Sequence, residues 1–180
     1  GGRVSGVSVA TGDGATVMIR ARRAVMLAAG GFAREAARLA RAYPHVARGG
    51  VHLSPVPDGN TGDGLRMGEE AGGRFQSGYP NAAAWMPVSR VPLGGGRFGV
   101  FPHLVDRYKP GFIMVLKNGR RFTNEACSYH DVGQAMQRAC AGGTDTGAWL
   151  IADHQTIRKY GIGFVKPMPM PLSPYLRSGY

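Results

Sequence analysis

The segment 110–139, PGFIMVLKNGRRFTNEACSYHDVGQAMQRA, combines polar side chains with elements that would hold them in place. After an apolar run comes Asn118-Gly119, a dipeptide that favours a tight hairpin because both residues adopt positive φ at little cost. A returning strand over 120–124 and a helix over 131–141 complete the predicted pattern. Tyr129 falls at the corner between this strand and this helix. Because rigid elements place side chains better than flexible loops do, the corner is a candidate reactive site.

Two glycine-containing segments are candidates for lying near a cofactor. Gly30-Gly31 follows an apolar run over 24–29 that predicts a strand buried on both faces, and glycines at a strand end let a cofactor approach bare backbone. The second segment, Asn60-Thr61-Gly62-Asp63, opens a predicted helix over 65–71, where exposed N–H groups and the helix dipole attract polar or anionic groups. Each segment also has a purely structural interpretation, a tight turn at the first and an N-cap role for Asp63 at the second.

An apolar stretch over 82–101 shows no regular period, and we predict that it is irregular. Within it, Trp85, Met86 and Pro87 are candidates for the wall of a pocket that binds an apolar ligand, or for ordinary core packing under a long loop. The glycines at 94, 96 and 99 match the dinucleotide pattern GxGxxG, but we predict no strand before them and no helix after them. The sequence therefore predicts a glycine-rich loop at this point.

The other predicted elements follow in chain order. They are a hairpin of 3–10 with 16–21, a helix over 34–43 that ends at Pro44, and a buried strand over 148–153. A short helix over 154–160 and an extended tail with four prolines over 161–180 complete the prediction.

Composition narrows the class of protein. The net charge of +11 comes from 22 Lys and Arg against 11 Asp and Glu, but the basic residues are scattered and do not alternate with aromatic residues, so we expect no nucleic-acid partner.

Cys127 and Cys140 indicate a reducing compartment, and hence the cytoplasm, rather than a disulfide framework. Their spacing predicts no metal site. No apolar run approaches the ~20 residues that span a bilayer. Since the chain opens directly into a strand without a starting Met, we expect it to be an internal piece of a longer protein.

Three motifs in order carry a resemblance to a known family. They are ARRAVMLAAGGF at 21–32, GNTGDGLRMGEEAGG at 59–73 and IMVLKNGRRFTNEACSYHD at 113–131. Together they resemble the fumarate reductase/succinate dehydrogenase flavoprotein superfamily, and the third motif resembles its 3-ketosteroid dehydrogenase branch.

The resemblance implies a mixed α+β fold with FAD as cofactor. Residues 1–62 would be the end of the first segment of a Rossmann-like FAD-binding domain, an α/β remnant, and 63–180 would be most of an α+β substrate (cap) domain. By analogy, the residues near the cofactor would be Gly30, Gly31, Asn60, Thr61, Gly62 and Asp63.

One position separates the branches of this superfamily. Fumarate-reducing members have an Arg five residues after the Asn that corresponds to Asn124, and ketosteroid dehydrogenases resemble this sequence in having Tyr there, at Tyr129. A dicarboxylate needs arginine clamps, whereas a steroid needs an apolar wall, for which Trp85, Met86 and Pro87 are candidates. The resemblance thus implies a dehydrogenase that desaturates an apolar ketone such as a 3-ketosteroid, with an external electron acceptor. The alternatives are a reductase of small unsaturated acids and a fragment without catalysis of its own.

In the implied mechanism a hydride passes to FAD and Tyr129 takes the neighbouring proton. A neutral phenol is a poor base, so it needs activation or a relay. His130 is a candidate relay, although a role at the helix start is the simpler expectation. Glu125 and Arg121 are expected to fix the corner structurally.

Overall fold

The computed structural model describes residues 2–143 and 145–177. The chain divides into two compact units, each held together by contacts among its own residues. Unit 1 contains Gly1–Ala36 and Asp58–Ser77, and unit 2 contains Ala37–Pro57 and Gly78–Tyr180. The three sheets formed by the described residues each have two antiparallel strands, and helices accompany them in both units. The mixed α+β class is therefore confirmed, while the predicted domain boundary at residue 62 stays a prediction.

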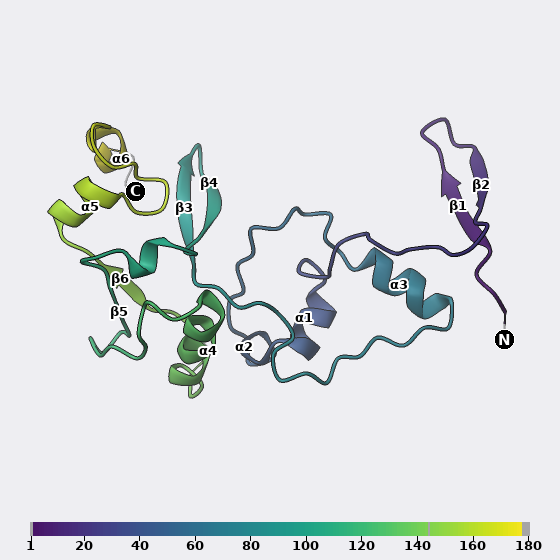
Figure 1. Ribbon diagram of the computed structural model, residues 1–180, viewed down its shortest axis with the longest axis horizontal. Helices are drawn as coiled ribbons and strands as arrows, with labels where there is room; N and C mark the ends of the chain where they lie inside the picture. Colours follow the sequence, from purple (N-terminus) through teal and green to yellow (C-terminus); the bar gives the residue numbers. More distant parts are fainter. Residues whose placement is uncertain (1, 144, 178–180) are drawn as a thin grey trace. The chain divides into compact units, whose positions relative to one another are not determined.

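Unit 1 begins with the predicted hairpin. Strands β1 (Gly6–Ala10) and β2 (Thr16–Arg20) pair in antiparallel register, with Gly6 opposite Arg20 and Ala10 opposite Thr16 (Figure 1). Gly6 lies so close to the carbonyl of Ile19 that a side chain at this position would collide with it. Every residue of β2 is exposed.

The strand predicted over 24–29 is wrong. These residues form no strand, and the side chain of Met26 is 89% exposed. A strand needs a neighbour to satisfy its N–H and C=O groups, and no strand in the described part of the chain pairs with this segment. Its apolar composition favours burial, but apolar residues alone do not supply a partner strand.

Helix α3 (Asp63–Glu70) is the predicted helix, which begins two residues earlier than expected. Its N-cap is Gly62, with a φ of 79°, and no side chain caps the helix there. The N-cap role considered for Asp63 is therefore wrong, because Asp63 is already helical. Glycine reaches this left-handed conformation without the penalty that a Cβ would bring.

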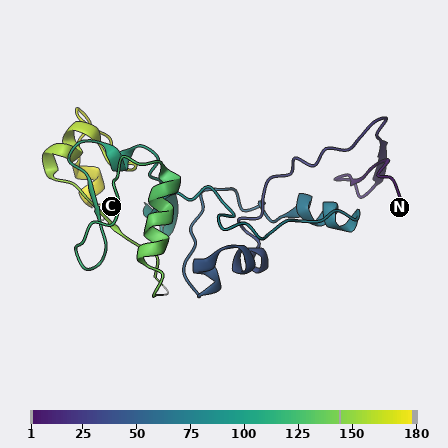
Figure 2. The ribbon, with the colours of Figure 1, turned by 60° about the horizontal axis from the view of Figure 1, so that its bottom comes forward.

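Unit 2 contains the other helices and strands, which are α1 (Ala36–Ala42, from its second residue), α2 (Pro44–Ala47), β3 (Val88–Gly94), β4 (Arg97–Pro102), η1 (Asp106–Tyr108), β5 (Ile113–Val115), α4 (Tyr129–Ala139), β6 (Trp149–Ile151), α5 (His154–Tyr160) and α6 (Ser173–Arg177). The strands pair as β3 with β4 and β5 with β6. Helices α5 and α6 lie side by side in both ribbon views (Figure 1 and Figure 2).

Two predictions in unit 2 are wrong in part. The stretch 82–101 is not irregular throughout, because β3 and β4 form a hairpin around Gly94-Gly95-Gly96, all with positive φ. A strand thus precedes the GxGxxG pattern, but another strand, not a helix, follows it. The returning strand over 120–124 is reduced to a single bridge between Val115 and Arg121, since β5 takes β6 as its ladder partner instead.

Smaller differences concern the ends of elements. Helix α4 begins at Tyr129 rather than at 131. Strand β6 is shorter than predicted and not buried, with Trp149 at 64% exposure. The tail after 161 includes the short helix α6. In the described residues no helix has the length and apolar character that crossing a membrane requires.

The core of unit 2 holds α4 against the segment that contains Trp85. Val132 on α4 is fully buried, and Trp85 is 6% exposed. A Cβ added to Gly133 would lie 2.6 Å from the Cβ of Trp85 and 3.1 Å from its carbonyl carbon, so only glycine allows this approach.

We expect Gly133→Ala to lower the free energy of unfolding of the full-length protein by about 1–2 kcal/mol. Overpacking costs ~1–3 kcal/mol, and the better helix propensity of alanine offsets up to ~1 kcal/mol of this. Gly68→Ala in α3 is the matched control, because its Cβ would make only a 3.4 Å contact with the end of Leu27. Thermal unfolding of both variants measures the difference, and equal melting temperatures would contradict the prediction.

Candidate functional site

The predicted cofactor residues of unit 1 lie together. An added Cβ on Gly30 would be 3.1 Å from Nδ2 of Asn60, and one on Gly31 would be 3.4 Å from its Oδ1. The Gly62 N–H donates to the Gly31 carbonyl at 3.0 Å, and the Arg34 N–H donates to the Asn60 carbonyl at 3.0 Å. The Gly30 turn and the start of α3 thus form one structure, although 30 residues separate them in the sequence.

Asn60 has a side-chain oxygen without a partner. Its Oδ1 is buried and accepts no hydrogen bond from any described residue. An orphan buried acceptor of this kind is uncommon in native proteins and calls for an explanation. A donor group on a bound molecule would satisfy it.

Thr61 and Asp63 are engaged with each other and with α3. The Thr61 hydroxyl donates to Oδ1 of Asp63 at 3.1 Å, and Arg66 donates to the same carboxylate oxygen and, at 3.0 Å, to the Thr61 carbonyl. The carboxylate of Asp63 is therefore already paired, and its clearest role is to hold the first turn of α3.

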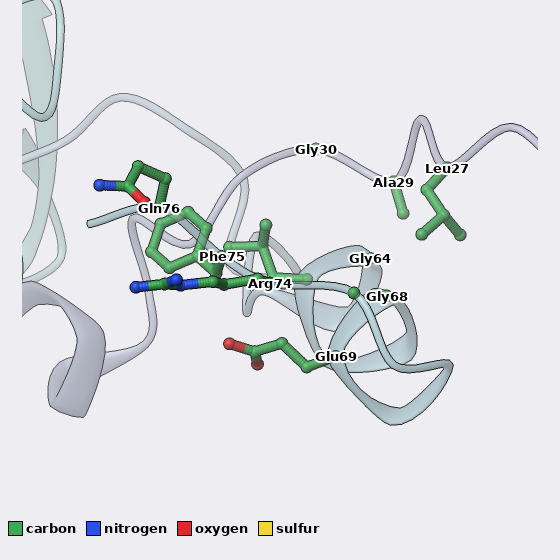
Figure 3. Close-up of a pocket in the computed structure, with 11 residues that line it drawn as sticks. Leu27, Ala29, Gly30, Gly64, Gly68, Glu69, Arg74, Phe75 and Gln76 are labelled. Atoms are coloured by element: carbon green, nitrogen blue, oxygen red, sulfur yellow. The ribbon is translucent and has the colours of Figure 1, made fainter. Parts of the chain in front are cut away.

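A pocket of about 270 Å³ lies on α3 beside this cluster (Figure 3). The segment with Leu27, Ala29 and Gly30 passes along the helix face that carries Gly64 and Gly68, where added Cβ atoms would meet Ala29 and Leu27 at 3.4 Å. Leu65 and Glu69 of α3 and residues 73–76 line the rest of the pocket. Of the predicted cofactor residues, only Gly30 lines it.

Tyr129 is the first residue of α4 in unit 2. Ser128 caps the helix, since its Oγ accepts from the Asp131 N–H at 3.2 Å and donates to the Asp131 carboxylate at 2.8 Å. The side chain of Tyr129 is 37% exposed, and its hydroxyl has no hydrogen-bond partner within the described residues. The capped helix fixes the backbone of Tyr129 and leaves the phenol available.

The predicted substrate wall meets the start of α4. The Trp85 N–H lies 3.1 Å from Nδ1 of His130, whose Nε2 is 2.9 Å from the amide nitrogen of Gln134. The indole of Trp85 packs edge-on against Tyr43 at 4.8 Å and belongs to the core. Pro87 is buried and lines a second cavity in unit 2. Met86 is half-buried beside them.

Glu125 fixes the corner ahead of α4, as expected. It is 5% exposed and accepts hydrogen bonds from the Met114 N–H at 2.7 Å and from Arg121 at 3.2 and 2.5 Å. Burial alone would raise the pKa of Glu125, but the hydrogen bonds from Arg121 and Met114 outweigh it, so the pKa lies below its ordinary value. The ionised carboxylate ties β5 to the corner.

A polar cluster in unit 2, buried except at Ser89, could not be found from the sequence. Ser89 Oγ lies 2.6 Å from His103 Nε2, and His103 Nδ1 lies 3.5 Å from Asp106 Oδ2, at ion-pair distance but without hydrogen-bond geometry. Burial lowers the pKa of His103, and the Asp106 carboxylate opposes this in part. Arg107 lies beside them and is 2% exposed. The spacing of His103, Asp106 and Arg107 was the available signal, but only the fold brings Ser89 to it.

Comparison with known proteins agrees with the architecture and the motifs. The family model described as "FAD binding domain" matches residues 1–167. The chain is 41% identical over 170 residues to a 4-oxocyclohex-2-ene-1-carboxylate 5-dehydrogenase of Sinomonas cyclohexanicum, covering 94% of this chain and 29% of that protein. It is 32% identical over 187 residues to a 3-oxosteroid 1-dehydrogenase of Mycolicibacterium smegmatis, covering 99% of this chain and 31% of that protein.

The structure is also similar to a solved one. The crystal structure of 3-ketosteroid delta1-dehydrogenase from Sterolibacterium denitrificans in complex with 1,4-androstadiene-3,17-dione has a TM-score of 0.67 and 28% identity, covering 95% of this chain and 30% of that chain. The chain thus spans less than a third of the length of these relatives. The match over residues 1–167 shows that this chain belongs to the family of FAD binding domains, and the relatives and the solved structure that it resembles are dehydrogenases by name.

Proposed function

We propose that the full-length protein is an FAD-dependent dehydrogenase that desaturates a ring next to a ketone. The relatives act, by their names, on a 3-oxosteroid and on a 4-oxocyclohexene carboxylate, and both compounds are cyclic ketones. The proposal rests chiefly on Tyr129, a partly exposed phenol fixed at the capped start of α4. FAD, when bound, supplies the hydride acceptor.

The residues in unit 1 fit such a cofactor. Gly30 and Gly31 present backbone without side chains, and the buried Oδ1 of Asn60 has acceptor capacity to spare. We propose that Gly30, Gly31 and Asn60 to Gly62 line the cofactor, with Asp63 holding the first turn of α3. The isoalloxazine ring and the ribityl chain of FAD carry N–H and O–H donors. One of these donors would satisfy the buried Oδ1 of Asn60.

Tyr129 is the proposed proton acceptor. A ring C–H beside a ketone is acidic, and the proton leaves to the phenolic oxygen while the hydride leaves from the adjacent carbon. As the phenol accepts this proton it releases its own to solvent, which reaches the 37% exposed side chain of Tyr129. His130 is bonded to Trp85 and Gln134, so it positions the segment rather than relaying protons.

A substrate panel with an artificial electron-accepting dye tests the function. The purified full-length protein is expected to be yellow and to reduce the dye with a 3-ketosteroid or with 4-oxocyclohexanecarboxylate. Fumarate, offered with a reduced dye, should not be turned over, because Tyr129 stands where fumarate-reducing enzymes have Arg. Reduction of fumarate without oxidation of either ketone would overturn the proposal in favour of a reductase.

A further inference from the structure

The second cavity of unit 2 is small and mixed in character. Its volume is about 120 Å³. Apolar groups of Pro87, Met114, Met136 and Leu150 line it, together with four polar side chains: Ser89, His103, Arg107 and Thr146. Ligand pockets for whole drug-sized molecules are usually ~300–1,000 Å³, so this cavity suits a small ring or one end of a ligand.

Arg107 is a buried cation without a counter-charge. It is 2% exposed, its terminal nitrogens donate to the carbonyls of Leu104, His103 and Cys127, and its Nε has no partner. No carboxylate pairs with it within residues 2–143 and 145–177. Burial lowers the pKa of Arg107, and a buried charge is costly unless it is paired. An anion in the cavity would supply the missing pair.

The neighbouring carboxylate is not available for this role. Asp106 accepts from Lys109 at 2.7 Å and from the Gly163 N–H at 2.9 Å, and its Oδ2 lies 3.5 Å from His103 Nδ1. Next to this carboxylate, the imidazole of His103 favours the tautomer with its proton on Nδ1. Nε2 is then an acceptor, so we assign the Ser89 hydroxyl as the donor to it. The charge of Asp106 is thus matched by Lys109.

Thr146 adds a second unused donor. Its Oγ1 is buried and has no partner in the described chain. Among the described residues that line the cavity, the groups without a hydrogen-bond partner are the Nε–H of Arg107, the hydroxyl of Thr146 and Nδ1 of His103, which faces Asp106. A guanidinium N–H together with a hydroxyl is a donor set that suits a carboxylate.

The cavity is also tied to the reactive corner. Arg107 holds the carbonyl of Cys127, two residues before Tyr129, and Pro87 belongs to the predicted substrate wall. We infer that the cavity binds a carboxylate carried by the substrate, so that the enzyme acts on small cyclic ketones bearing a carboxylate rather than on steroids. The inference rests on the proposed function and narrows its substrate class.

Direct binding to the full-length holoenzyme tests the inference without turnover. Cyclohexanecarboxylate, which has no ketone, should bind in calorimetry, and Arg107→Met should weaken its binding about 10–100-fold, the loss of one charged hydrogen-bonding partner. Thr146→Val should weaken it about 3–10-fold. Arg97→Met, at the exposed end of β4, is the matched control and should change nothing.

Kinetics then link the cavity to the substrate. In Arg107→Met, kcat/KM for 4-oxocyclohexanecarboxylate should fall, while kcat/KM for its uncharged methyl ester should not. If Arg107→Met does not fold, Thr146→Val gives the same comparison with a milder change.

Three results would overturn the inference. They are absence of carboxylate binding, as for a cavity that holds only water; binding that neither variant weakens; and acetate binding as tight as cyclohexanecarboxylate, which would indicate a site for free small anions. A protein that binds the carboxylate but oxidises no ketone would refute the proposed function and leave the anion site standing.

Discussion

Replacing Tyr129 with phenylalanine should cost the full-length enzyme most of its turnover and leave its yellow flavin in place. Positioned proton transfer contributes typically 10²–10⁴-fold to rate, so kcat should fall by about that factor. The substitution removes only a hydroxyl that has no partner in the described chain. Folding and cofactor content should therefore stay the same.

The measurement for Tyr129→Phe is dye-coupled kcat together with the flavin absorption spectrum of the purified variant. Ser128→Ala is a useful comparison, because it weakens the helix cap without touching the phenol and should lower stability more than rate. Unchanged turnover in Tyr129→Phe would exclude this tyrosine as the proton acceptor.

Glu125→Gln should destabilise the protein by about 1.5–3 kcal/mol at pH 7, the scale of a lost hydrogen bond to a buried charged group. Glutamine keeps the shape of Glu125 but loses the charge that Arg121 and the Met114 N–H stabilise. The folded-state pKa of Glu125 is lowered. Its stabilisation is therefore complete above the pKa of the unfolded chain and is lost as the pH falls through the folded-state pKa.

The difference in melting temperature between wild type and Glu125→Gln should thus be largest near neutral pH and should shrink as the pH falls below the ordinary glutamate value of 4.5. Asp145→Asn, which breaks the exposed pair between Lys117 and Asp145, is the control and should have little effect at any pH. A difference that stays constant down to pH 3 would show that the charge of Glu125 is not what stabilises the corner.

Local signals in the sequence predicted much of the site. The hairpin over β1 and β2, the helix after Asn60 to Gly62 and the structural role of Glu125 and Arg121 at the corner depend on neighbouring residues, and the structure confirms them. The resemblance to the family implied that Gly30 and Asn60 lie near one cofactor, and the structure brings these two residues together.

What the sequence could not predict depends on partners far away along the chain. The segment 24–29 has the composition of a buried strand, but strand formation requires a neighbour. Trp85 is a candidate both for a pocket wall and for core packing by sequence, and its contact with Tyr43 and its burial assign the indole to the core. The burial of Arg107 arises because carbonyls from two separate segments converge on its guanidinium.

The hairpin of β1 and β2 has a practical consequence. Both outer edges of this two-stranded sheet carry backbone groups without a ladder partner in the described chain, and Val17, Met18 and Ile19 are all exposed. Open edges with apolar side chains are templates for intermolecular strand addition. Protein engineers who express a piece of the protein that exposes this hairpin will therefore be handling an aggregation-prone edge, and a lysine on β2 is the natural gatekeeper to install.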